Sequence, residues 1–248
     1  MKIIISPAKK LCSQPMNKEV RPSKIQFETE AKYLISQLRK YPLAQVKELM
    51  NLSDSLAKLN HDRFKSWDLK SEYANHAIYM FQGDVYKGLK VNDLTEDEIL
   101  FAQDNLLIIS GLYGILKPLD LIYPYRLEMG TKMKTNKGKN LYEFWGSKLN
   151  NTLKSSMSED DFLINLASNE YSKAVKLNKL ERKIITPIFK DFKNGSLKVV
   201  SFFAKKARGE MVNFILKNKI NNIDEIKMFS NNGYKFHQED GGDIIFAR

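Results

Sequence analysis

Cysteine is almost absent from this chain, because Cys12 is the single cysteine among 248 residues. One cysteine excludes an internal disulfide framework and fits a reducing compartment. Two lysines, Lys9 and Lys10, precede it, which leaves a peroxide-sensing thiol open, although an inert loop cysteine is the simpler interpretation. The sequence therefore predicts a cytoplasmic protein that is stabilised by its core alone.

Long hydrophobic runs are also missing. No run approaches the ~20 apolar residues that a membrane-spanning helix needs. The apolar residues 3–5 form too short a run, too soon followed by Pro7, to serve as a signal peptide. We therefore expect a soluble protein with no membrane partner.

Several well-known catalytic signatures do not occur. The three histidines, His61, His76 and His237, have no metal-ligand spacing with one another or with Cys12, so the sequence predicts no metal and no cofactor. There is no GxxxxGK[ST] loop, and the glycines around Ser110 do not form the GxSxG elbow of hydrolases. The sequence therefore gives no support to a P-loop nucleotide hydrolase or to a serine hydrolase with a GxSxG elbow.

Acidic residues are outnumbered by 40 basic residues to 29, which gives a net charge of +11. Because 33 of the basic residues are lysines, part of this excess reflects a lysine-rich composition. The distribution is more informative, since eight basic and only two acidic residues lie between Lys190 and Lys219. Such clustering is typical of a phosphate-binding surface, although a solvated helix face is the simpler explanation for Lys217 and Lys219.

Hydrophobic patterning predicts an α/β or α+β fold in which helices surround a mixed sheet, organised as a single large domain over residues 1–248. We expect strands at 2–5, 77–81, 106–109, 162–166, 183–189, 197–203, 234–238 and 243–247. We expect helices at 27–39, 43–50, 53–64, 95–105, 141–154 and 204–218, with Asn194-Gly195 as a hairpin turn. The alternation of elements is too irregular for a simple doubly wound sheet.

Polar, glycine and proline residues are densest in residues 110–130, directly after the predicted strand 106–109. Loops of this kind, placed at the end of a buried strand, commonly bind ligands. Arg126 and Glu128 are the charged residues of greatest interest here. The simpler alternative is a structural crossing loop in which these two residues pair with each other.

Six motifs, in one order over nearly the full length, resemble the YaaA-like family. They comprise residues 6–11 (SPAKKL), 81–89 (FQGDVYKGL), 110–130, 165–171 (NLASNEY), 201–209 and 233–236 (GYKF). Lys10 stands where the family usually has threonine, and Lys117 where arginine is common. The family is described as DNA-binding proteins of the bacterial cytoplasm that protect against peroxide stress. The resemblance thus implies a role in limiting oxidative DNA damage or in iron homeostasis.

The resemblance and the charge distribution together predict backbone-directed binding of double-stranded or structured DNA in a basic cleft, by a monomer. The expected DNA-binding residues are Lys9, Lys10, Asn51, Ser53, Arg126, Lys173, Lys205, Lys206 and Arg208. Residues 49–57 fit the frame of a helix-hairpin-helix element, which the family is reported to contain, with Asn51 and Ser53 in place of two glycines. An ordinary helix-turn-helix core contact explains the same apolar spacing.

Carboxylates among these motifs favour a second hypothesis, an enzyme that acts on a nucleotide, a nucleobase or a damaged DNA base. A passive DNA clamp needs cations but not carboxylates, which repel phosphate. The candidate catalytic residues are Asp84, Glu128 and Glu170, with Arg126 holding a phosphate or carbonyl. Alternatively, these carboxylates only orient the neighbouring cations through ion pairs. A deep pocket that gathers Lys9 with the four residues would favour chemistry, and an open basic groove would favour DNA clamping.

Overall fold

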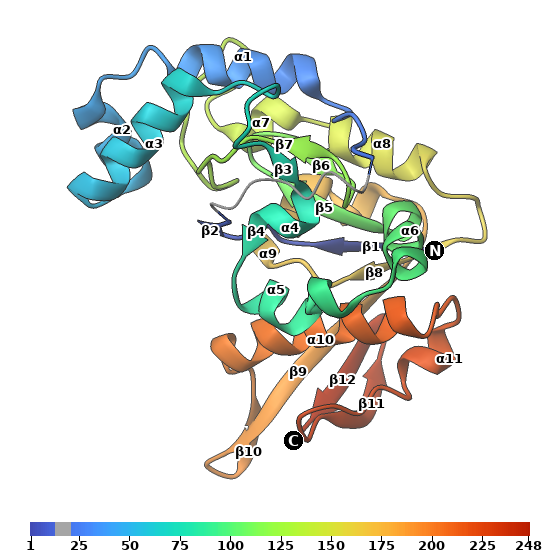
Figure 1. Cartoon of the computed structure of the whole chain (residues 1–248). Helices are drawn as coiled ribbons and strands as arrows, with labels where there is room; N and C mark the ends of the chain where they lie inside the picture. The colour runs from blue at the N-terminus through green and yellow to red at the C-terminus, as the bar shows by residue number, and fades with distance from the viewer. Residues whose placement is uncertain (13–20) are drawn as a thin grey trace.

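An eight-stranded mixed sheet forms the centre of the protein in the computed structural model, which describes residues 1–12 and 21–248. The strand order is β11-β12-β9-β8-β1-β5-β6, and β10 pairs with β9 (Figure 1). The strands are β1 (Lys2–Ile5), β5 (Leu106–Ser110), β6 (Gly114–Leu116), β8 (Phe162–Asn165), β9 (Lys183–Lys193), β10 (Ser196–Lys198), β11 (Lys235–Asp240) and β12 (Asp243–Ala247). Neighbours from β12 to β5 run parallel, whereas β6, β10 and β11 are antiparallel to their partners. The predicted mixed sheet is confirmed.

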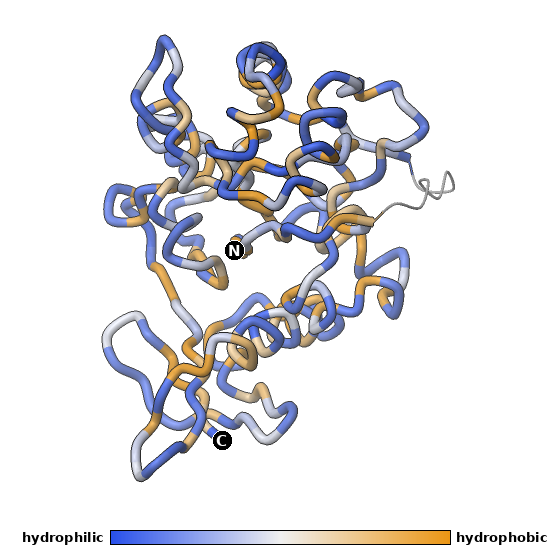
Figure 2. Tube along the Cα trace, turned by 90° about the vertical axis from the view of Figure 1, so that its left-hand side faces the viewer, coloured by the Kyte–Doolittle hydropathy of each residue, from blue (hydrophilic) through white to orange (hydrophobic). Residues whose placement is uncertain are grey.

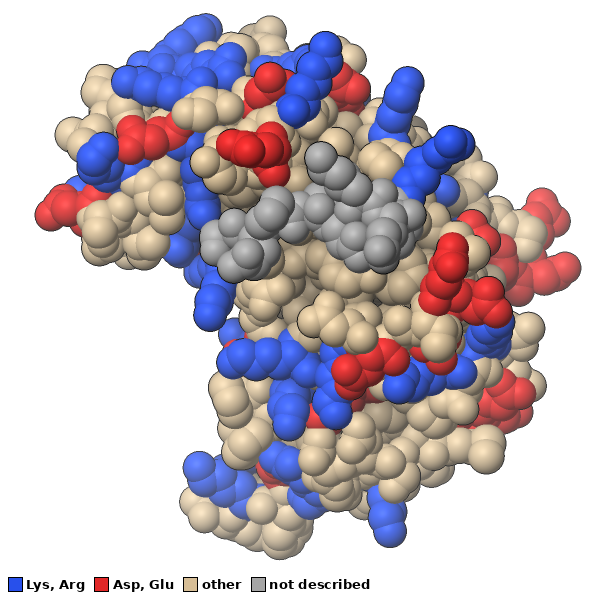
Figure 3. Space-filling view, in the orientation of Figure 1, with Lys and Arg blue, Asp and Glu red and all other residues tan. Residues whose placement is uncertain are grey.

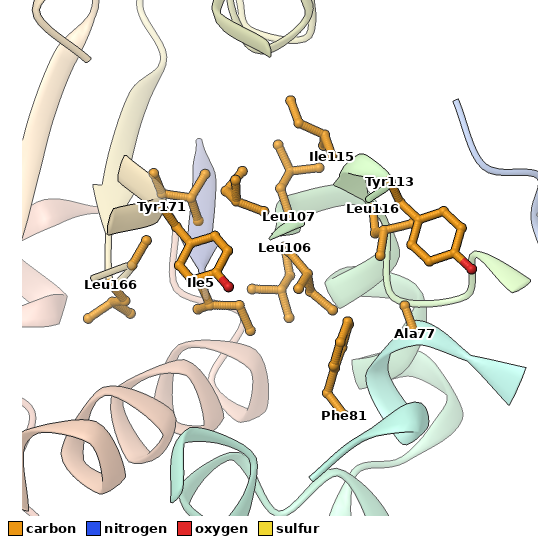
Figure 4. Packing of buried hydrophobic residues seen from close by; sticks show 14 of the residues in the cluster. Ile5, Ala77, Phe81, Leu106, Leu107, Tyr113, Ile115, Leu116, Leu166 and Tyr171 are labelled. Atoms are coloured by element: carbon orange, nitrogen blue, oxygen red, sulfur yellow. The ribbon is translucent and has the colours of Figure 1, made fainter. Parts of the chain in front are cut away.

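The inner strands are continuous apolar runs because both faces of the sheet are covered. Ile3, Ile4 and Ile5 of β1 are fully buried, and every residue of β5 is buried. Hydrophobic segments accordingly run through the interior, while hydrophilic residues dominate the outer helices and loops (Figure 2). Figure 4 shows side chains of β1 and β5 close together, with Tyr171 and Phe81 reaching toward them from other elements.

Helices lie on both sides of the sheet (Figure 1). They are α1 (Glu28–Leu38), α2 (Leu43–Met50), α3 (Asp54–Ser66), α4 (Ala77–Met80), α5 (Asp84–Leu89), α6 (Glu96–Asn105), α7 (Leu141–Trp145), α8 (Lys148–Ser155), α9 (Asn169–Val175), α10 (Ser201–Lys217) and α11 (Ile223–Ile226), with 3-10 turns at Val91–Asp93 and Leu177–Lys179. Two short strand pairs complete the fold: β2 (Lys10–Leu11) with β4 (Phe81–Gln82), and β3 (Asn75–His76) with β7 (Leu121–Ile122). No helix in residues 1–12 or 21–248 combines the length and apolarity needed to cross a membrane.

Three sequence predictions about secondary structure were wrong. Residues 77–81 were expected as a strand, but Ala77–Met80 is one helical turn before the two-residue strand β4. The expected helix over 141–154 is two helices, because Gly146 adopts a positive φ of 55° between them. The expected strand 197–203 ends at Lys198, and α10 begins at Ser201.

Helices α5 and α10 cross at backbone contact, and this crossing positions part of the site. A Cβ atom on Gly209 would lie 1.7 Å from the carbonyl oxygen of Val85, and one on Gly88 would lie 2.1 Å from the carbonyl oxygen of Lys206. Only glycine therefore fits at these two positions. The contact fixes the start of α5, which carries Asp84, against the middle of α10.

Helices α2 and α3 form a hairpin that projects from the body of the protein (Figure 1). Asn51 ends α2 in the left-handed conformation with a φ of 49°. Ser53 instead has a φ of −66°, and its hydroxyl caps α3 by accepting from the Leu56 N–H at 3.4 Å. The first position thus adopts the backbone that favours glycine, whereas the second acts as an ordinary N-cap.

Candidate functional site

A cavity of about 300 Å³ lies where parallel strands β1 and β8 end. Its walls come from residues 6–10 after β1, residues 82–86 around the start of α5, residues 125–128, residues 168, 170 and 171 after β8, and residues 205 and 208 of α10. Strand β5 pairs with one edge of β1 and strand β8 with the other edge. The connections that leave the two strands β1 and β5 therefore lead to opposite sides of β1, which makes this end of β1 a topological switch point. Ligands of open α/β sheets bind at the carboxyl ends of strands at such a switch point.

Glu128 is held by two cations inside this cavity. Its Oε2 lies 2.6 Å from Lys9 Nζ, and its Oε1 accepts from Arg126 Nη2 at 3.0 Å. Both carboxylate oxygens are therefore engaged, which favours a role in orienting Lys9 and Arg126. The Nε of Arg126 is buried and meets no acceptor among the described residues, so this guanidinium retains a donor beside the cavity.

Three other cations line the cavity without a carboxylate partner. Within the described parts of the chain, no carboxylate lies within 4.0 Å of Lys10, Lys205 or Arg208. Burial lowers the pKa of Arg208, because a charged guanidinium is less stable away from water. Lys10 and Lys205 are exposed and only Arg208 is partly buried. Three neighbouring cations without a carboxylate partner favour an anionic ligand.

Tyrosines form the deep wall of the cavity. The Tyr86 hydroxyl donates to the Ser6 carbonyl at 3.1 Å, and the Tyr125 hydroxyl lies 2.5 Å from Ser110 Oγ. Burial raises the pKa of Tyr86, Tyr125 and Tyr171, so their phenols are neutral at pH 7. The wall thus offers aromatic surface and neutral hydroxyls opposite the cations.

Asp84 and Glu170 are the remaining carboxylates at the cavity. Asp84 pairs with the exposed Lys87 at 3.3 Å, and Glu170 accepts from the Gly130 N–H at 2.8 Å. In the described part of the chain, neither forms an ion pair with a cation of the cavity wall, in contrast to Glu128. These two are accordingly the better placed of the three candidates for proton transfer.

The structure brings most of the expected site residues together. Lys9, Lys10, Asp84, Arg126, Glu128, Glu170, Lys205 and Arg208 all line the cavity, whereas Lys206, Lys173, Asn51 and Ser53 do not. Lys206 pairs with Glu210 at 3.5 Å, and the Lys173 ammonium lies 5.2 Å from the ring centre of Tyr142. Asn51 and Ser53 lie in the α2–α3 hairpin.

Tyr125 and Ser168 also line the cavity, although sequence reasoning did not single them out. Ser168 N–H donates to Ser6 Oγ at 2.9 Å, which joins the segments that follow β1 and β8. A polar residue soon after a buried strand was the available signal for Ser168, whereas Tyr125 resembles any core aromatic. Within residues 1–12 and 21–248, no three histidine, cysteine, aspartate or glutamate side chains gather as metal ligands.

Basic side chains gather beyond the cavity as well. Figure 3 shows lysine and arginine along the hollowed left-hand side of the molecule, between the part that carries α2 and α3 and the part that carries β10. Acidic side chains are fewer along this hollow than on the opposite edge of the same view. A polyanion would meet a favourable field there.

Comparison with known proteins identifies close relatives. Residues 1–240 match the family model described as peroxide stress protein YaaA. A UPF0246 protein of Saccharophagus degradans is 46% identical over 254 aligned positions, covering 100% of this chain and 99% of the relative. UPF0246 proteins of Aliivibrio fischeri (49% identical, 95% of this chain and 93% of the relative) and Shewanella baltica (48%, 96% and 95%) are similarly related.

Proposed function

Because the chain belongs to the family of the peroxide stress protein YaaA, we propose that it acts under peroxide stress in the cytoplasm by binding DNA through the phosphate backbone. The observation that carries this proposal is the set of three cations at the cavity, Lys10, Lys205 and Arg208, that no described carboxylate neutralises. We call this set the phosphate clamp. Phosphate oxygens are the partners that unpaired ammonium and guanidinium groups bind best.

The basic hollow around the clamp supports a polymer as the ligand rather than an isolated anion. The hollow extends from the cavity toward the α2–α3 hairpin on one side and the β9–β10 hairpin on the other (Figures 1 and 3). A helix-hairpin-helix contacts DNA phosphates without reading bases, and Asn51 adopts the left-handed backbone expected at its turn. The α2–α3 hairpin is therefore the proposed second contact with the DNA backbone.

Counterion release gives the proposal a measurable form. Each phosphate that a protein neutralises on duplex DNA contributes about −0.9 to the slope of log K against log salt. Full engagement of the clamp therefore contributes about −2.7. The Lys10→Ala/Lys205→Ala variant removes two of its charges, so its slope should be shallower by about 1.8.

The test is fluorescence anisotropy of a labelled duplex across a salt series. The matched control is Lys217→Ala/Lys235→Ala, which removes two equally exposed lysines that do not line the cavity. We expect the control to keep the slope of the original protein. Equal slopes for the two variants, or an affinity that is flat with salt, would contradict DNA binding by the clamp.

The carboxylates that line the cavity favour a second candidate function, an enzyme acting on a nucleotide, a nucleobase or a damaged base of DNA. Asp84 and Glu170 reach the same cavity as the clamp and the buried tyrosines. A carboxylate beside a held phosphate is suited to general acid or base catalysis. A protein that only binds the phosphate backbone of DNA does not need a carboxylate beside the bound phosphate.

Isosteric neutral variants separate the two functions. Glu170→Gln retains an oxygen that accepts from the Gly130 N–H but cannot transfer a proton as a carboxylate does. If the protein is an enzyme, Glu170→Gln should keep its affinity for DNA yet fail to restore peroxide survival to cells that lack the protein. The exposed Glu72→Gln is the control. Full protection by both Glu170→Gln and Asp84→Asn would contradict catalysis by these carboxylates.

A further inference from the structure

Two large aromatic side chains lie in solvent at the start of α10. Phe202 is 57% exposed and Phe203 is 42% exposed, and their rings meet edge to face with centroids 5.7 Å apart. The apolar stripe of the same helix is buried without them, since Ala204, Ala207 and Met211 face the core. The buried face of α10 therefore includes neither ring, and the exposure of Phe202 in particular calls for another explanation.

Phe202 lies next to the phosphate clamp. Residues three and four apart on a helix are neighbours on its surface, so Phe202 shares a face with Lys205 and Lys206. Lys205 lines the cavity, and Arg208 follows it by three residues. The exposed ring consequently extends the rim of the cavity by one helical turn.

Phe203 carries a cation on its ring. The Arg248 guanidinium lies 4.4 Å from the ring centre of Phe203 and 4.5 Å from that of Tyr234, and its Nε contacts Asp191 Oδ1 at 2.6 Å. The patch thus combines two exposed aromatic rings with Arg248, which is paired with Asp191, and with Lys205, which has no carboxylate partner among the described residues. We define the base platform as Phe202 and Phe203.

We propose that the base platform stacks unpaired bases of single-stranded DNA whose phosphates the clamp binds, an inference that rests on the proposed DNA-binding function. Exposed aromatics interleaved with lysine and arginine are the combination by which proteins hold single strands, because every base has a face that can stack. A base stacked on Phe202 would have its adjoining phosphate within reach of Lys205, which lies one helical turn further along α10.

Charge argues for a nucleic acid rather than a second copy of this chain as the occupant. Lys206 and Arg248 are each paired with a carboxylate, but Lys205, one helical turn from Phe202, has no carboxylate partner among the described residues. A second copy of this chain docked on the same face would bring its own Lys205 toward this one, which is unfavourable. A polyanion with aromatic bases satisfies both the rings and the cations.

The experiment compares single-stranded oligothymidylate and a duplex as probes for three single variants. Phe202→Leu keeps an apolar side chain without a ring, Phe202→Trp keeps a ring, and Phe236→Ala removes a phenylalanine of equal exposure to Phe203 on β11. We expect Phe202→Leu to weaken single-strand binding by about 5-fold or more, while duplex binding changes less than 2-fold. Phe202→Trp should retain single-strand affinity, and its tryptophan fluorescence should be quenched by the bound oligothymidylate. Phe236→Ala should behave as the original protein.

The outcomes distinguish this inference from the function on which it depends. Suppose that Lys10→Ala/Lys205→Ala weakens duplex binding as expected, but Phe202→Leu binds oligothymidylate as tightly as the original protein. Base stacking on Phe202 and Phe203 is then refuted, and the proposed DNA binding stands. If the original protein binds neither probe at low salt, both are refuted. A lower molecular mass of Phe202→Leu than of the original protein in sedimentation, with unchanged DNA affinity, would identify the face as a self-association surface and overturn the inference.

Discussion

Substitution of Gly209 by alanine tests whether the crossing of α5 and α10 builds the cavity. A Cβ at this position would lie 1.7 Å from the Val85 carbonyl oxygen, whereas ordinary van der Waals contact begins at 3.4 Å. The obstacle is backbone on both sides, so no side chain can rotate to make room. The two helices must therefore separate by about 1.7 Å, which moves Asp84 away from Lys205 and Arg208.

The expected loss of stability follows from two opposing effects. Alanine gains about 1 kcal/mol over glycine in a helix interior. Overpacking of a close contact costs about 1–3 kcal/mol, and an unyielding backbone contact belongs at the upper end of that range or beyond it. We therefore expect Gly209→Ala to lower the free energy of unfolding by about 2 kcal/mol, together with a loss of DNA affinity in the folded variant.

Urea unfolding, measured by circular dichroism, provides the assay. The control is Gly195→Ala, because Gly195 has a positive φ of 75° but nothing within 4 Å of an added Cβ. Gly195→Ala should lower the free energy of unfolding by only about 1 kcal/mol, because alanine is strained in this left-handed backbone conformation. If Gly209→Ala instead raised the free energy of unfolding by the roughly 1 kcal/mol that alanine gains over glycine in a helix, α5 and α10 would not be in backbone contact. That result would refute the reasoning.

Three further predictions concern the scaffold. Burial raises the pKa of Glu30, but its ion pair with Lys148 outweighs that effect and the pKa is lowered below its ordinary value of 4.5. The pair should stabilise α1 against α8 in full above about pH 4.5, by at most ~1 kcal/mol. A double-mutant cycle with Glu30→Gln and Lys148→Met should show the coupling decline below that pH and vanish once the pH has passed the lowered pKa of the folded protein. Ser110→Ala should lower the free energy of unfolding in urea by ~1–3 kcal/mol, because the buried Ser110 Oγ accepts from the N–H groups of Leu112 and Tyr113. An unchanged urea midpoint would mean that these two N–H groups find other acceptors. Asn51→Ala should lower the thermal midpoint, because the left-handed backbone at this position destabilises an alanine by about 1 kcal/mol. Asn51→Gly should not lower it, since glycine adopts this backbone without strain. Equal midpoints for the two variants would show that the turn relaxes.

Local signals in the sequence predicted much of the fold. Thr95 and Glu98 form the expected capping box at the start of α6, because both partners lie within one helical turn. Asn194 and Gly195 both adopt positive φ in the turn that pairs β9 with β10, as their residue types indicate. By contrast, residues 77–82 form a single helical turn and a two-residue strand, and both elements are too short for hydrophobic periodicity to distinguish.

The site itself depended on information that periodicity does not contain. Sequence reasoning identified Lys9 and Lys10 after β1, and Arg126 and Glu128, as site residues. It did not show that β8 lies beside β1 and brings Ser168 to them. Strand order is set by crossover connections, and no local pattern specifies it. The close approach of Gly88 and Gly209 is similarly invisible in the chain, since the two residues are far apart in sequence and meet only across the packed helices.

Pairing divides the charged residues of the cavity into two groups with different roles. Lys9 and Arg126 are both engaged with Glu128, so their positions are fixed before any ligand arrives. Lys10, Lys205 and Arg208 have no such carboxylate partner among the described residues, so an anion that binds them displaces no protein ion pair. The first group shapes the cavity, and the second is the group to which we assign the proposed affinity for phosphate. Because Lys205 and Arg208 belong to the helix that Gly209 fixes against α5, the packing of the core and the proposed binding of phosphate depend on the same segment of chain.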